Sequence, residues 1–159
     1  LKPANVLLER DTDGTPGRVL LTDFGVAALP SSDAQPAPGL SVGTPLYMSP
    51  EQLVGDHAID GRSDLYALGI LGFALLTGRP PFRGRTLGEL SARHLLQRAP
   101  SLARLAPDAP TALVTAIERC LAKDPAARWR SGREMYDALS RRVTIDWKRW
   151  TGALRAAVI

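Results

Sequence analysis

The sequence predicts a mainly α-helical domain that begins with a short β-hairpin and is built around one buried helix. Two short apolar runs near the start are separated by DTDGTPG, a composition that favours a hairpin turn. The later run LYALGILGFALLTG has no charged residue, as expected of a buried helix. Three Ser or Thr residues are each followed, three positions on, by Glu or Gln, which indicates a helix start.

The composition is that of one globular domain. With 159 residues, 45% of them hydrophobic and 23% charged, the chain is long enough to bury a core. The charge-free run is shorter than the roughly 20 apolar residues of a membrane span. The single cysteine, Cys120, cannot form an internal disulfide, so we expect a reducing compartment and a cytoplasmic location. Neither Cys120 nor the two histidines show metal-ligand spacing.

The predicted hairpin places two polar residues side by side. Its strands are the runs Asn5–Leu8 and Arg18–Leu21. Because antiparallel strands joined by a turn begin and end at the same edge, Asn5 and Asp23 are expected at the open end. The stretch 26–43 that follows is rich in Ser, Pro, Ala and Gly and has no period, so it is predicted to be a long loop.

Helices account for the rest of the predicted fold. Ser49 with Pro50 begins a short helix, and the buried helix runs from about Ser63 to Gly78, where Pro80 and Pro81 prevent continuation. Three further helices are predicted from capping signals and helical spacing: one after Thr86, one bearing Leu113, Ile117, Cys120 and Leu121 on one face, and one after Ser131.

The C-terminal end of the chain is basic. Residues 128–159 carry eight Lys or Arg and three Asp or Glu, a balance that suits an anionic membrane, nucleic acid or simple solvation. Within it, residues 143–159 are predicted to be a basic amphipathic helix or linker, with Trp147, Trp150, Leu154 and Val158 on one stripe. That stripe suits either helix packing or contact with a membrane surface.

The open end of the hairpin has the chemistry of a phosphate and metal site. Asn5 offers an amide oxygen and Asp23 a carboxylate, both hard ligands suited to Mg²⁺, and Lys2 adds an ammonium group. Magnesium is often held by one or two protein oxygens together with substrate phosphates, so two ligands suffice. Gly25 would allow a sharp backbone turn just after Asp23.

Several motifs occur together in a characteristic order. They are LKPAN at the start, DFG at 23–25, GTPLYMSPEQ at 43–52, SDLYALG at 63–69 and CLAKDPAARW at 120–129. As a set they resemble the C-terminal lobe (C-lobe) of a eukaryotic-type serine/threonine protein kinase, most closely its bacterial members. The resemblance covers 1–142, implies a C-lobe without its N-terminal lobe, and leaves 143–159 as a separate segment. SPE stands where the family has APE.

The resemblance implies roles for residues around the hairpin. Asp23 would hold Mg²⁺ bridging the β- and γ-phosphates of ATP, and Asn5 would hold a second Mg²⁺. LKPAN resembles the second half of the family's catalytic loop. Within that loop Lys2 would neutralise charge on the γ-phosphoryl group, and Thr44 would contact the loop beside Lys2. An acid that accepts the substrate proton, within His-Arg-Asp, is expected immediately before Leu1. We therefore expect the 159 residues alone to transfer no phosphate.

Other implied roles are structural or regulatory. Glu51 and Arg128 would form a buried ion pair, and Asp64 would hydrogen-bond the catalytic-loop backbone from the central helix. As a simpler alternative, Glu51 and Asp64 are ordinary acids near helix N-termini. The loop before Pro45 resembles an activation segment, with possible phosphorylation sites at Ser31, Ser32, Ser41 and Thr44.

The resemblance predicts an enzyme that transfers the γ-phosphate of ATP to Ser or Thr hydroxyls of protein substrates. A non-catalytic kinase remnant or pseudokinase acting as a binding module is the alternative, to be decided by the upstream sequence. A nucleic-acid partner is not expected, because only the basic C-terminal end favours one and no stacking or groove-reading motif accompanies it. Membrane association is expected only through sequence beyond this chain.

Overall fold

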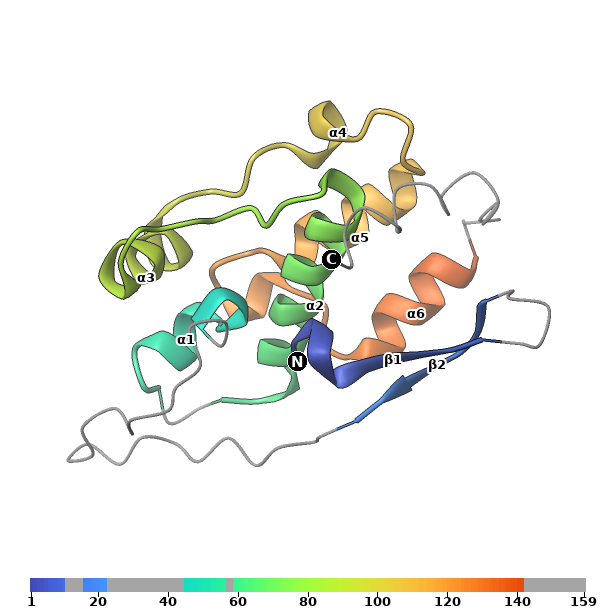
Figure 1. Cartoon of the computed structure of the whole chain (residues 1–159), viewed down its shortest axis with the longest axis horizontal. Coiled ribbons are helices and arrows are strands. Elements are labelled where there is room, and N and C mark those ends of the chain that lie inside the picture. The colour runs from blue at the N-terminus through green and yellow to red at the C-terminus, as the bar shows by residue number, and fades with distance from the viewer. Residues whose placement is uncertain (11–15, 23–44, 57–58, 142–159) are drawn as a thin grey trace.

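The computed structural model of the chain describes residues 1–10, 16–22, 45–56 and 59–141. These residues form a mainly helical fold with one two-stranded antiparallel sheet, as the sequence predicts (Figure 1). The elements are β1 (Val6–Arg10), β2 (Pro16–Leu21), α1 (Pro50–Leu53), α2 (Gly61–Thr77), α3 (Leu87–Leu96), α4 (Leu102–Leu105), α5 (Thr111–Cys120) and α6 (Gly132–Ser140). Short 3₁₀ turns occupy Pro3–Asn5, Pro45–Tyr47 and Pro125–Ala127. The predicted C-terminal helix, which carries Trp147 and Trp150, lies outside the described residues. The same is true of His57.

The hairpin is confirmed, with longer strands than predicted. Val6 pairs with Leu21 and Leu8 with Val19, and the pairing continues with a register irregularity to Arg10 and Pro16. An ion pair between Arg18 Nε and Glu9 Oε2, 2.8 Å apart, joins the two strands within this extension. Asn5 lies in the 3₁₀ turn just before β1 and not in the strand itself. Pairing thus reaches into the polar stretch that was expected to be turn.

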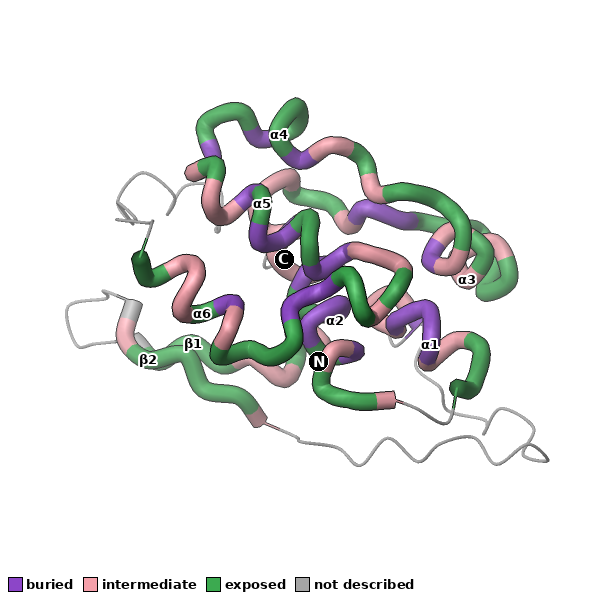
Figure 2. Tube along the Cα trace, turned by 180° about the vertical axis from the view of Figure 1, so that it is seen from behind, coloured by how far each residue is buried: buried purple, intermediate pink, exposed green. Residues whose placement is uncertain are grey.

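Helix α2 runs through the centre of the fold (Figures 1 and 2). It begins at Gly61, two residues before the predicted Ser63, because the Asp60 side chain accepts a hydrogen bond from the Arg62 amide and caps the helix. It ends as predicted, with Gly78 in the left-handed conformation at φ 74°. Tyr66, Ile70 and Phe73 are almost fully buried, as expected of the charge-free run.

The three capping signals are confirmed as helix starts. Ser49 Oγ accepts from the Gln52 amide, and the Gln52 side chain accepts from the Ser49 amide, which completes a capping box at α1. Thr86 Oγ1 accepts from the Glu89 amide at α3, and Ser131 Oγ accepts from the Glu134 amide at α6. Helix α4 was not predicted, because four residues are too few to show a helical period.

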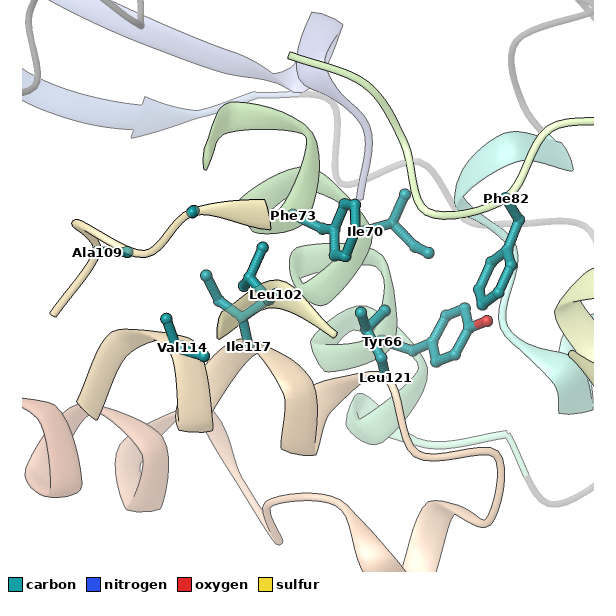
Figure 3. Close-up of a cluster of buried hydrophobic side chains, with 10 residues drawn as sticks. Tyr66, Ile70, Phe73, Phe82, Leu102, Ala109, Val114, Ile117 and Leu121 are labelled. Atoms are coloured by element: carbon teal, nitrogen blue, oxygen red, sulfur yellow. The ribbon is translucent and has the colours of Figure 1, made fainter. Parts of the chain in front are cut away.

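Two clusters of buried side chains form the core. The larger one joins α2 to α4 and α5 around Tyr66, Phe73 and Ile117 (Figure 3). The smaller one contains Cys120 and Trp129, so the predicted core position of Cys120 is confirmed. Helices α2 and α5 approach closely at Gly69, where an added Cβ would stand 2.8 Å from Cys120 Cβ. None of the described helices is long and apolar enough to cross a membrane.

A buried polar cluster ties α3 to the core. His94 is fully buried, and its Nδ1 lies 3.1 Å from the Tyr66 hydroxyl. The Lys123 ammonium donates to the His94 carbonyl and to the Tyr66 hydroxyl, and it lies 4.1 Å from the centre of the Phe82 ring. Burial, and then the nearby Lys123 charge, lower the pKa of His94 to about 4. His94 is therefore neutral in the folded protein at pH 7.

The buried His94 is expected to make the protein less stable as the pH falls from about 6.5 to about 4. In that range the unfolded chain binds a proton that the folded chain does not, so the loss approaches about 3 kcal/mol at the acidic end. Urea unfolding at pH 7 and pH 5 should show the loss in the wild type and a smaller one in His94→Asn. Equal losses in both proteins would contradict this role for His94.

Candidate functional site

The open end of the hairpin brings Asn5 next to the start of the segment that carries Asp23. The backbone carbonyl of Asn5 accepts a hydrogen bond from the backbone N–H of Thr22 at 2.9 Å. The backbone N–H of Asn5 donates to the backbone carbonyl of Lys2, also at 2.9 Å. Pro3 begins the 3₁₀ turn between them, where its fixed φ and missing N–H are tolerated. Asn5 therefore lies beside Thr22, the residue before Asp23, while the expected approach of Asn5 and Asp23 stays a prediction because Asp23 lies outside the described residues.

Lys2 and Asn5 are neither buried nor fully exposed. Both residues are partly exposed, whereas Pro3 and Ala4 between them are exposed. The start of this segment also touches α2, because the terminal ammonium group of Leu1 lies 3.2 Å from Asp64 Oδ1. The bond expected from Asp64 to a backbone amide of this loop stays a prediction. The Asp64 side chain is 76% exposed, so the contact lies at the surface and contributes little to stability.

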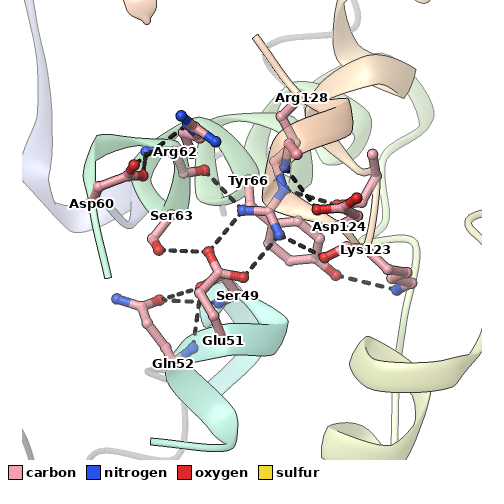
Figure 4. Close-up of polar contacts among 12 residues, drawn as sticks. Ser49, Glu51, Gln52, Asp60, Arg62, Ser63, Tyr66, Lys123, Asp124 and Arg128 are labelled. Atoms are coloured by element: carbon pink, nitrogen blue, oxygen red, sulfur yellow. Dashed lines mark hydrogen bonds and ion pairs between the residues drawn. The ribbon is translucent and has the colours of Figure 1, made fainter. Parts of the chain in front are cut away.

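Glu51 and Arg128 form the expected ion pair in the interior (Figure 4). Two parallel hydrogen bonds join them, from Nη1 to Oε1 at 2.7 Å and from Nη2 to Oε2 at 2.8 Å. The exposed fractions of the side chains are 0% for Arg128 and 7% for Glu51. Such a two-pronged contact combines charge attraction with fixed geometry. The pair links α1 to the segment that precedes α6.

The remaining polar atoms of the pair are also bonded. Arg128 donates to three backbone carbonyls, those of Ala122, Arg62 and Lys123, at 2.8 to 3.0 Å. Ser63 Oγ donates to Glu51 Oε1 at 2.6 Å. Burial raises the pKa of Glu51, but the hydrogen bonds from Arg128 and Ser63 outweigh it and leave the pKa at about 2. Glu51 is therefore ionised at neutral pH.

Several predicted site residues lie outside the described residues: Asp23, Gly25, Ser31, Ser32, Ser41 and Thr44. Within the described part of the chain, no group of three or more His, Cys, Asp or Glu residues is placed to hold a metal ion. The sequence reasoning missed Ser63 and the carbonyls of Arg62 and Ala122 as partners of the ion pair. Only Ser63 gave a signal, as a hydroxyl in the first turn of the buried helix.

The comparison with protein families decides the relationship. A model of the protein kinase domain matches residues 1–139. The chain belongs to the protein kinase domain family. This kinase domain segment is 42% identical over 132 residues to serine/threonine-protein kinase Pkn1 of Myxococcus xanthus, 82% of this chain and 19% of that protein. It is 37% identical over 135 residues to PrkC of Bacillus subtilis, 85% of this chain and 20% of that kinase.

For a third relative, the chain matches a larger share of the relative's length. The kinase domain segment is 36% identical over 141 residues to serine/threonine-protein kinase PknA of Mycobacterium tuberculosis, 88% of this chain and 30% of that protein. The chain thus spans less than a third of the length of each of these relatives. Protein kinases as a family use ATP and Mg²⁺ and act on protein substrates.

Proposed function

We propose that residues 1–142 are the C-lobe of a serine/threonine protein kinase. The complete protein transfers the γ-phosphate of ATP to Ser or Thr hydroxyls of protein substrates. The named relatives support this activity, since each is called a serine/threonine-protein kinase. The single buried Cys120 supports a reducing compartment such as the cytoplasm. Residues 143–159 form a separate basic segment in this proposal.

The exposed hairpin supports a larger catalytic domain around this lobe. Leu7, Leu8 and Val19 are 49%, 58% and 61% exposed, and Leu20 and Leu21 are also exposed. Because successive strand residues point to opposite faces, both faces of the hairpin expose large apolar side chains, which indicates a contact surface. In the proposal this surface meets the part of the kinase that holds ATP, which explains why apolar side chains stand beside a polar site.

The hydrogen bond from the Thr22 amide to the Asn5 carbonyl is the observation that carries the proposal. It sets the Asn5 backbone beside Thr22, the residue before Asp23 in the sequence. In this proposal the Asn5 amide oxygen and the Asp23 carboxylate act together at the open end of the hairpin. This donor set fits magnesium, which prefers hard oxygen ligands. When bound, Mg²⁺ supplies charge compensation for the β- and γ-phosphates.

In this proposal the chain's own residues position the γ-phosphoryl group and compensate its negative charge. Lys2 places its ammonium against the γ-phosphoryl group, where negative charge is concentrated during transfer. Thr44 contacts the same loop from the activation segment. Phosphoryl transfer requires little covalent help from protein, so positioning supplies most of the rate.

The ion pair holds the far end of the activation segment in place. Glu51 lies in α1, two residues beyond the 3₁₀ turn Pro45–Tyr47. Arg128 ties it to the first turn of α2, through Arg62, and to Ala122 just after α5. Ser31, Ser32, Ser41 and Thr44 precede this anchor and remain the proposed phosphorylation sites. A phosphate on one of these residues would change the conformation of a segment whose C-terminal end is held by the ion pair.

Replacing Asn5 by Ala is expected to raise the Mg²⁺ concentration needed for half-maximal activity of the full-length protein. The loss of one metal-ligand oxygen should cost about 10- to 100-fold in metal affinity or activity, as for residues that support a metal site. The measurement is phosphate transfer to a Ser-containing peptide at increasing Mg²⁺ and constant Mg·ATP.

Gln97→Ala is the matched control, since it removes an exposed amide at the end of α3. It should leave the Mg²⁺ dependence unchanged. An Asn5→Ala protein with the Mg²⁺ dependence of the wild type would count against Asn5 as a metal ligand. A wild-type protein without any transfer activity would favour a non-catalytic binding module.

A further inference from the structure

One stretch of the fold is strongly basic and lies away from the hairpin. Residues 79–107 contain six arginines and one acid, Glu89. Glu89 pairs with Arg93 at 2.7 Å, which neutralises both charges. The other five arginines are exposed, and none forms an ion pair with a described residue: Arg79, Arg83, Arg85, Arg98 and Arg104. We call these five residues the arginine ridge.

The fold brings the two halves of the arginine ridge together. The connection from α2 to α3 and the connection from α3 to α4 run alongside each other in opposite directions (Figures 1 and 2). The first carries Arg79, Arg83 and Arg85, and the second carries Arg98. The five exposed arginines of the ridge therefore come from two neighbouring connections and from α4.

A groove of about 720 Å³ borders the ridge. Arg98 and Arg104 line one part of it, and the end of α5 with Lys123 lines another. Its apolar lining comes from small or compact side chains: Ala99, Pro100, Leu121, Ala122 and Ala127. The groove lining thus combines two arginines and a lysine with apolar side chains.

The two acids that line the groove are already engaged within the chain. Glu118 Oε1 accepts from the Leu102 amide at 2.8 Å and so satisfies the first turn of α4. Asp124 Oδ1 accepts from the Ala126 amide at 2.8 Å and caps a 3₁₀ turn. Arg98 and Arg104 have no such internal partner among the described residues, so they are available to an outside carboxylate.

We propose that this groove and the arginine ridge bind an extended acidic segment of a partner protein. Guanidinium groups match carboxylates with two parallel hydrogen bonds and are weakly hydrated, so exposed arginines suit recognition of Asp and Glu side chains. The apolar part of the lining takes aliphatic side chains that alternate with the acids in an extended segment. The site is separate from the proposed catalytic function and does not depend on it.

A protein segment fits this surface better than other anions do. The groove lining contains no aromatic side chain on which bases could stack. A continuous phosphate backbone would also pass the Glu118 and Asp124 carboxylates, whereas a peptide places its acids only at the arginines. A membrane surface presents its charge on a broad plane and cannot follow a concave groove.

The position of the groove favours a docking role. It lies between α4 with the connection before it and the segment that follows α5, whereas the start of the hairpin segment meets α2 at its first turn, where Leu1 touches Asp64. A segment bound in the groove leaves the hairpin site free. The partner can therefore be held while another part of it occupies the hairpin end.

The test measures binding of a fluorescein-labelled peptide to the full-length protein by fluorescence anisotropy. The peptide has about ten residues, rich in glutamate and leucine, matching an extended segment of about 3.3 Å per residue. The double variant Arg98→Glu with Arg104→Glu should weaken binding by about 10-fold or more, because reversed charges repel the peptide. The binding should also weaken as salt is raised.

The matched control is Arg133→Glu with Arg141→Glu, which changes the net charge equally on exposed positions at α6. It should change peptide affinity by less than about twofold, because distant exposed charges are screened. Thermal unfolding of both variants checks that they fold, as expected for exposed positions. If either double variant fails to fold, single charge reversals at the same positions replace it.

Three results would overturn the proposal. The first is that the peptide does not bind the wild type. The second is that both double variants weaken binding equally, which would indicate only a general charge effect. The third is that a single-stranded DNA or a phosphatidylserine vesicle binds more tightly than the peptide and loses more affinity in the Arg98 and Arg104 variant.

Discussion

Arg128→Ala is expected to lower the free energy of unfolding by about 3–5 kcal/mol, because it leaves the Glu51 carboxylate buried without its cationic partner. The same change removes the donors to three backbone carbonyls. Those carbonyls are acceptors that water cannot easily reach around a side chain that is 0% exposed. Urea unfolding of the full-length protein measures the loss.

The controls separate the buried pair from an ordinary ion pair. Arg133→Ala breaks an exposed pair with Asp137 and should cost about 0.5 kcal/mol. Replacing both partners, with Glu51→Leu and Arg128→Met, should cost less than the sum of the single changes, since no charge is then stranded. A loss in Arg128→Ala no larger than that in Arg133→Ala would contradict the interior role of the pair.

Asp23→Asn is expected to lower the phosphate-transfer rate of the full-length protein by about 100-fold or more, the loss typical of removing one key electrostatic contact at a reacting group. Asparagine keeps the shape of the side chain but removes the negative charge that holds Mg²⁺. The effect should fall mainly on kcat, because the proposed contact is strongest as charge moves between the phosphates. Steady-state rates with varied ATP measure it.

Asp108→Asn provides the same chemical change at an exposed residue between α4 and α5. It should leave kcat and KM within about twofold of the wild type, since exposed charges far from a site are screened. If Asp23→Asn and Asp108→Asn behave alike, Asp23 is not a metal ligand in the reaction.

Local features of the fold could be read from the sequence because short-range physics determines them. Ser49, Thr86 and Ser131 cap helices as expected, since a cap depends on residues within one turn. The hairpin followed from turn residues between apolar runs. The predicted strand bounds were wrong by one or two residues, because pairing between the strands decides them. The predicted start of α2 was two residues late, because the Asp60 cap decides it.

Contacts between distant residues could not be obtained in this way. The pair of Glu51 and Arg128 joins residues 77 positions apart, and it was expected only because the motifs resemble a known family. The cluster of Tyr66, His94 and Lys123 has no local signal, because its members come from different elements. At the candidate site the sequence indicated Lys2 and Asn5, while the Thr22 bond to Asn5 required the structure.

The most direct test of the account is to supply the full-length protein with Mg²⁺ and ATP labelled on the γ-phosphate, and to identify the labelled amino acids. We expect label on serine or threonine of a protein substrate, and its disappearance in Asp23→Asn. Label on neither residue, or undiminished label in Asp23→Asn, would contradict the proposal that this kinase domain segment belongs to an active serine/threonine kinase.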